Sequence, residues 1–168
     1  GLKDQPLLNP EFPSYDFDVI SGLQWEIDLS QPALWSHDGR AQGTGAGRIR
    51  HLRFKGCPVE AGQEFIVATN SYRIAGSGLY APLAEAEVVL AETTSSREVL
   101  IRHIASTGGL RGPVERCWRF APMRGCEAVL ETGPGALRHL DALAVSGVRQ
   151  LVPDGPGESG FQRLRLTL

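Results

Sequence analysis

Alternating apolar and polar positions predict strands in the first third of the chain. Apolar side chains at 23, 25, 27 and 29 alternate with polar ones at 24, 26 and 28. This is the pattern of a strand with one face on a core. Residues 48–54 alternate less strictly, and residues 16–20 are interpreted as a shorter strand ahead of the turn at Ser21 and Gly22. The glycine-rich stretch 36–47 predicts a long loop.

The run 65–69, Phe-Ile-Val-Ala-Thr, predicts a buried strand because it is apolar, partly β-branched and preceded by a turn at 60–62. Asn70, Tyr72, Gly76 and Gly78 follow it. A large aromatic at the end of a rigid strand, beside backbone that can approach a ligand closely, is suited to holding a flat ring. The alternative is that Tyr72 is a surface tyrosine and the glycines form an ordinary turn.

The second half of the chain predicts two helices among further strands. Ser95 and Glu98 match a capping box, after which apolar positions 99, 100 and 104 and His103 form one stripe that ends at Gly108. Pro134 suits the first turn of a helix that closes at Gly147. Residues 84–90 fit either helix or strand, whereas 118–120, 128–131, 148–152 and 161–168 predict strands. The order predicts one α+β domain with mixed sheets over residues 1–168, opened by an extended arm, 1–13.

Length and charge exclude some classes of partner. The 168 residues have a formal net charge of −2, and the 15 arginines and two lysines are scattered. We therefore expect no DNA partner, since DNA binding needs clustered basic residues. No apolar run approaches the roughly 20 residues that cross a bilayer, so we expect no membrane partner.

The sequence provides no recognisable catalytic or metal constellation. The four histidines and three cysteines lack the short spacings of a zinc site, and His103 is interpreted as a packing or surface residue. The carboxylates at Asp16 and Asp18 are interpreted as strand or turn residues. We predict no catalytic residue and no metal ligand in this chain.

Several stretches, taken together, closely resemble one known family. The stretches are 13–20, 27–33, 64–73, 117–122, 130–132 with Pro134, and 160–168. They resemble the C-terminal domain of bacterial 2′,3′-cyclic-nucleotide 2′-phosphodiesterase/3′-nucleotidases, a branch of the 5′-nucleotidase family, and they extend over nearly the whole chain.

The resemblance implies a 5′-nucleotidase C-terminal-like fold of layered mixed β-sheets with flanking helices. It implies that Tyr72 stacks on a nucleobase, with Asn70, Gly76 and Gly78 forming the rest of the nucleotide-binding site. It also implies a periplasmic location and an N-terminal metallophosphoesterase domain of the same polypeptide, which carries two divalent metal ions as the catalytic cofactors. On this comparison the chain is an N-terminally truncated substrate-binding domain. The isolated chain is then expected to be inactive, with a tendency to self-associate.

The resemblance also separates branches of the family. Gly78 stands where typical 5′-nucleotidases carry an Asp that contacts ribose, as in the cyclic-phosphodiesterase branch. Ser71, Ser77 and Leu79 depart from that branch. The alternative function is therefore a non-catalytic binding or structural module with a decayed pocket. A periplasmic location would permit a disulfide between the cysteines at 117 and 126, and three independent cysteines are the alternative.

Overall fold

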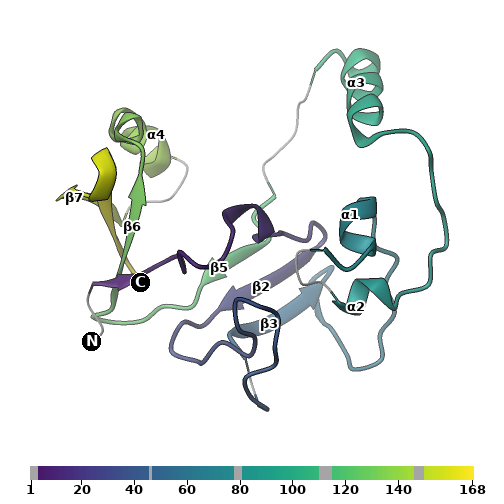
Figure 1. Cartoon of the computed structure of the whole chain (residues 1–168), viewed down its shortest axis with the longest axis horizontal. Coiled ribbons are helices and arrows are strands. Elements are labelled where there is room, and N and C mark those ends of the chain that lie inside the picture. Colours follow the sequence, from purple (N-terminus) through teal and green to yellow (C-terminus); the bar gives the residue numbers. More distant parts are fainter. Residues whose placement is uncertain (1–3, 46, 78–80, 110–114, 146–149) are drawn as a thin grey trace.

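The computed structural model describes residues 4–45, 47–77, 81–109, 115–145 and 150–168, and within them two mixed four-stranded sheets confirm the α+β class (Figure 1). The first sheet has the order β1 (Gln5–Pro6), β6 (Glu127–Thr132), β8 (Gln162–Thr167) and β7 (Leu151–Pro156). The second has the order β4 (Cys57–Pro58), β3 (Ile49–Phe54), β2 (Leu23–Ile27) and β5 (Trp118–Phe120). The α-helices are α1 (Ser71–Ile74), α2 (Ala81–Ala84), α3 (Ser96–Thr107) and α4 (Leu140–Val145), and the 3-10 helices are Ser14–Asp16, Pro134–His139 and Glu158–Gly160.

The first sheet is built around β8, which pairs antiparallel with both β6 and β7. Leu164 in β8 is 2% exposed and lies opposite Leu130 on one side and Pro153 on the other. Ala128 is buried equally deeply beside Leu166. These alternating small and large apolar residues form the best-buried part of the molecule.

The second sheet carries an aromatic cluster around Trp118 of β5. β2 and β5 run parallel with Trp25 opposite Trp118. The ring of Trp118 makes edge contacts with Phe120 at 5.2 Å and with Phe17 at 5.8 Å between centroids. Phe17 thereby fixes the irregular segment before β2 to this sheet.

The predicted strand 16–20 is wrong. Ser14–Asp16 is a single 3-10 turn, closed by the Asp16 amide donating to the Pro13 carbonyl at 2.9 Å, and the residues after it are irregular. The Asp16 side chain is buried against an arginine from a distant part of the chain. A tertiary ion pair has therefore overridden the local alternating pattern.

The buried strand predicted at 65–69 is also wrong. This run has no regular secondary structure and pairs with no strand among the described residues, and Ile66 is 86% exposed. Residues 85–90, which fit either helix or strand, form neither. Strand formation needs a partner for the backbone groups, and the described part of the chain offers none at these two runs.

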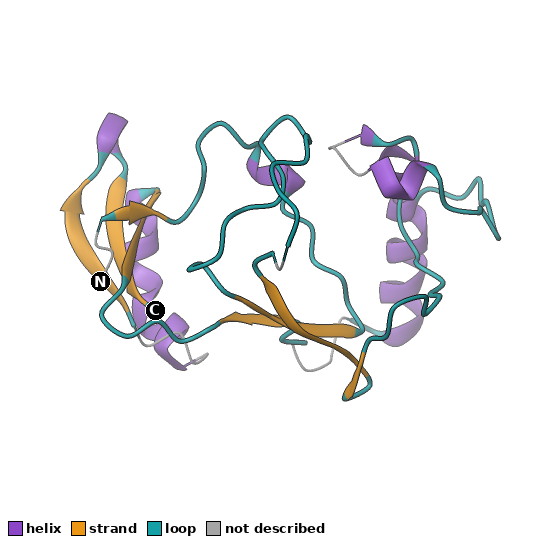
Figure 2. Ribbon diagram, turned by 90° about the horizontal axis from the view of Figure 1, so that it is seen from below, coloured by secondary structure: helices purple, strands orange, loops and turns teal. Residues whose placement is uncertain are grey.

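The two predicted helices are confirmed, with differences at their ends. The Ser95 hydroxyl accepts from the Glu98 amide at 3.2 Å, and Gly108 ends α3 at a φ of +70°, but the Glu98 carboxylate pairs with Arg102. The apolar stripe of α3 is not buried. Figure 1 shows this helix standing away from both sheets, and Figure 2 shows it at the end of the molecule opposite the first sheet. The helix after Gly133 begins as the 3-10 turn and continues as α4; its predicted end at Gly147 lies outside the described residues.

The remaining strand predictions hold with shifted bounds. Strands predicted at 23–29, 48–54, 118–120, 128–131 and 161–168 correspond to β2, β3, β5, β6 and β8. β7 extends to Pro156 rather than stopping at 152. The described part of the arm is irregular apart from β1, which pairs parallel with β6. In the ranges that the structure describes, no helix is long and apolar enough to span a bilayer.

The chain exposes more surface than a compact monomer of its size. Its accessible surface is 13115 Å² for a mass of 18.2 kDa. The scaling found for compact monomers gives about 8,100 Å² at this mass. The surplus of about 5,000 Å² is in keeping with the exposed apolar runs at 65–69 and 88–90 and the exposed stripe of α3.

Candidate functional site

The candidate site centres on α1, a single helical turn that carries Tyr72. Asn70 is its N-cap, with an extended backbone and a side-chain oxygen that accepts from the Arg73 amide at 3.0 Å. Tyr72 is 53% exposed as a residue. Of the predicted site residues, Tyr72 therefore presents its ring to solvent, while the Asn70 side chain is engaged in shaping the turn.

Gly76 closes this turn next to α2. Its amide donates to the Arg73 carbonyl at 3.0 Å, and its φ of +78° is a conformation that favours glycine. A Cβ at Gly76 would lie 3.4 Å from the Cβ of Ala84, so the two short helices pack closely there. Gly78 lies outside the described residues.

Arg73 joins two sequence motifs that lie more than fifty residues apart. Its guanidinium donates to the Asp16 carboxylate at 2.8 Å, to the Tyr15 carbonyl at 2.9 Å and to the Asp18 carboxylate at 2.8 and 3.0 Å. Arg73 and Asp16 are both buried, whereas the Asp18 side chain is 38% exposed. We call this set of contacts the Arg73 clamp.

The clamp fixes both charge and position beside the tyrosine. The hydrogen bonds that Arg73 donates to the Asp16 and then the Asp18 carboxylate raise its pKa despite its burial, so the guanidinium stays charged. The Arg73 Cζ lies 5.3 Å from the centroid of the Tyr72 ring. Tyr72 is thus held on a turn whose neighbouring residue is anchored at several points.

Sequence reasoning missed the Arg73 clamp. It interpreted Asp16 and Asp18 as ordinary strand or turn residues and gave Arg73 no role. The available signal was that the stretches 13–20 and 64–73 both carry the family resemblance, since two motifs that serve one site are expected to meet in space. Nothing in the spacing of the chain identifies their partner.

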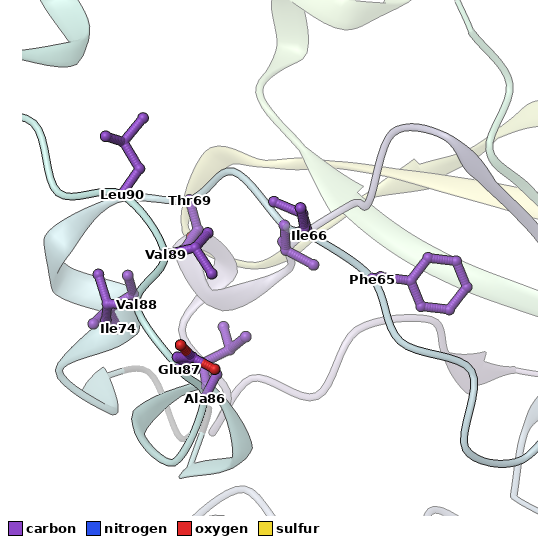
Figure 3. Close-up of a pocket in the computed structure, with 11 residues that line it drawn as sticks. Phe65, Ile66, Thr69, Ile74, Ala86, Glu87, Val88, Val89 and Leu90 are labelled. Carbon is purple, nitrogen blue, oxygen red and sulfur yellow. The ribbon is translucent and has the colours of Figure 1, made fainter.

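A small apolar trough lies beside α1 (Figure 3). It encloses about 140 Å³, and Ile74 of α1 contributes to its lining. The other lining residues come from the irregular runs on either side of α1 and α2 and from Leu83: Phe65, Ile66, Val67, Thr69, Ala86, Glu87, Val88, Val89 and Leu90. Glu87 is the one charged residue among them, so the trough suits an apolar occupant.

A wider polar hollow of about 450 Å³ lies on the second sheet. The Glu26 carboxylate lies between the Arg119 guanidinium and His51 Nδ1, the latter at 2.8 Å. Hydrogen bonds from Arg119 and then His51 hold the pKa of Glu26 below its usual value. The hollow is therefore lined by an internal charge network that contains the ionised carboxylate of Glu26.

The described residues do not fit a divalent metal centre. Within the ranges that the structure covers, His, Cys, Asp and Glu side chains form no group of three that could hold an ion. The three cysteines are free, and burial raises the pKa of the Cys117 thiol. No step of metal chemistry is assigned to the side chains of this chain.

The sequence is similar to parts of several much larger bacterial proteins. It is 36% identical over 141 residues to the 2′,3′-cyclic-nucleotide 2′-phosphodiesterase/3′-nucleotidase of Salmonella typhimurium, which covers 79% of this chain and 22% of that protein. Its match to the protein of the same name from Haemophilus influenzae is 31% over 170 residues, or 95% and 26% of the two chains. It is also 33% identical over 129 residues to the trifunctional nucleotide phosphoesterase YfkN of Bacillus subtilis, covering 77% of this chain and 9% of YfkN.

The chain thus spans about a tenth to a quarter of the length of the curated relatives that it matches, and it corresponds to a C-terminal part of them. No family model and no solved structure matches it.

Proposed function

We propose that this chain, which is homologous to the C-terminal part of bacterial 2′,3′-cyclic-nucleotide 2′-phosphodiesterase/3′-nucleotidases, is the nucleoside-recognition part of such a metallophosphoesterase. The larger polypeptide would hydrolyse 2′,3′-cyclic nucleotides and 3′-nucleotides in the periplasm. Its preceding domain would hold the divalent metal ions and carry out the chemistry.

The observation that carries this proposal is the Tyr72 ring, half exposed on a turn that the Arg73 clamp anchors. A nucleobase can stack on such a ring, and a good aromatic platform contributes roughly 1 to 3 kcal/mol per base. Anchoring matters because a ring that is already positioned loses little freedom when the base binds. The role of this chain is therefore to bind and orient the nucleoside.

The proposal is tested by replacing Tyr72 in the complete polypeptide that contains this chain. Tyr72→Phe keeps the aromatic face and should retain most activity on 2′,3′-cyclic AMP. Tyr72→Ala should weaken affinity or kcat/KM for that substrate by about five- to more than a hundredfold, which is the stacking free energy converted to a ratio. A matched control is Phe161→Ala, which removes the aromatic ring of a residue that is 48% exposed next to the first sheet. This substitution should leave the affinity and the kcat/KM for 2′,3′-cyclic AMP unchanged.

A substrate without a base separates recognition from chemistry. Turnover of bis(p-nitrophenyl) phosphate should barely change in Tyr72→Ala. Damage to the reacting centre would lower the turnover of both substrates, whereas loss of the stacking ring lowers the turnover of the nucleotide alone. Unchanged nucleotide kinetics in folded Tyr72→Ala protein would refute the assignment. The alternative, a non-catalytic module with a decayed pocket, would then be favoured.

A further inference from the structure

The apolar trough is flanked by two stretches with the composition of strands that lack a sheet. Residues 65–69 and 88–90 are apolar apart from Thr69, and five of these eight residues are β-branched. Both line the trough, yet neither pairs with a strand among the described residues. Sequences of this kind favour β-strands that lie on a pleated, half-buried surface. The irregular conformation of the two stretches does not provide that environment.

The exposure of these stretches is large and concentrated. Ile66, Val89 and Leu90 are 86%, 64% and 73% exposed. These stretches contribute to the surplus surface of the chain, which is about 5,000 Å² over a compact monomer. Contiguous apolar patches beyond a few hundred Å² mark interaction sites, and unpaired runs beside them can accept a further strand.

We infer that this trough is a docking surface for an apolar β-strand from the preceding part of the same polypeptide. The inference rests on the proposed function in one respect, that the chain is the C-terminal part of a longer protein. Its relatives are about four to eleven times as long as the segments they share with it, which leaves ample chain to supply the occupant. A strand that is covalently linked to this chain is present at an effective concentration in the millimolar range. The trough, of about 140 Å³, therefore needs no high intrinsic affinity for that strand.

The chemistry of the occupant follows from the lining. Glu87 is the single charge among the lining residues, so the inserted face of the strand must be apolar. The backbone groups of the two flanking runs can form hydrogen bonds with an extended partner. A helix could not use them, because the backbone groups inside a helix are already paired with one another. Docking would convert residues 65–69 into the strand that their composition predicts.

Hydrogen exchange provides the first test, on wild-type protein without nucleotide. We expect the amides of residues 65–69 and 88–90 to exchange at least about tenfold more slowly in the complete polypeptide than in the isolated chain, because strand pairing protects them. The amides of β8, which are paired in the structure, act as an internal reference. Equal exchange in the two proteins would overturn the inference.

A charge placed in the trough provides the second test. Ile66→Asp in the complete polypeptide should lower the Tm by several degrees or more, whereas the same substitution in the isolated chain should change it little, because the site is already exposed there. Val152→Asp is the matched control, since Val152 is 50% exposed on β7, away from the trough. An Ile66→Asp effect no larger than that of Val152→Asp in the complete polypeptide would contradict docking.

The remaining outcome identifies a different occupant. If residues 65–69 become protected in the isolated chain as its concentration rises, together with dimer formation in light scattering, the trough binds a second copy and the inference is wrong. The effect of Tyr72→Ala on nucleotide kinetics is measured on a different substitution and by a different observable from hydrogen exchange, Tm and light scattering. Failure of base recognition can therefore be told apart from failure of docking.

Discussion

Urea unfolding of the isolated chain should expose much less surface than unfolding of a compact domain of equal length. A chain of 18.2 kDa has an unfolded accessible surface of about 26,000 Å², and the folded chain retains 13115 Å². Folding thus buries about half of the surface, against about 70% for compact domains of this size. Because the m-value scales with the surface exposed on unfolding, it should be about three quarters of the compact value.

The assay is an equilibrium urea titration followed by circular dichroism at several protein concentrations, with a compact single-domain protein of about 170 residues measured alongside. Light scattering on the same samples establishes that the chain is monomeric. Denatured chains are more compact than extended ones, but this correction affects both proteins and largely cancels in the ratio. An m-value equal to that of the compact reference, in a demonstrated monomer, would refute the exposed-surface reasoning.

Three further predictions address packing, charge and positioning. Leu164→Ala should destabilise the chain by about 2 to 5 kcal/mol, while Val152→Ala, at an exposed position of the same sheet, should cost well under half as much in chemical denaturation. The pKa of Glu26 is lowered in the folded state, so its ionised carboxylate stabilises the fold at pH values above its usual pKa of 4.5, and this contribution is lost as the pH falls below that value. A urea midpoint that did not fall between pH 5 and pH 3 would be contrary evidence. Arg73→Gln should release the Tyr15–Asp18 segment and accelerate its hydrogen exchange, whereas Arg102→Gln, which breaks an exposed pair within α3, should not.

Local signals in the sequence predicted the elements that depend on local contacts. The α3 start follows from the Ser95 hydroxyl and its end from Gly108, both of which act within one turn. β2 follows from alternation, because it lies in a sheet whose partner strands are in the same chain. Whether each of these elements is a helix or a strand can therefore be predicted without knowledge of the rest of the fold.

The failures occurred where the deciding contact is distant in sequence. Residues 16–20 alternate well enough for a strand, but burial of Asp16 against Arg73 sets their conformation. Residues 65–69 have strand composition without a strand partner. In the candidate site, Tyr72 and Gly76 could be chosen from sequence, whereas the use of the Asn70 side chain as a cap and the anchoring of Arg73 required coordinates.

The position of Tyr72 is determined by tertiary contacts on two sides of α1. A helix of four residues is far below the length at which helices are stable alone, so α1 exists because its surroundings hold it. On one side, Arg73 is fixed by Asp16 and the Tyr15 carbonyl; on the other, Ile74 reaches into the apolar trough. If a strand docks in that trough, it completes the support of the turn that presents the ring. Base recognition should then depend on docking. Ile66→Asp should therefore weaken nucleotide binding in the complete polypeptide, although residue 66 is not part of the surface on which the base stacks.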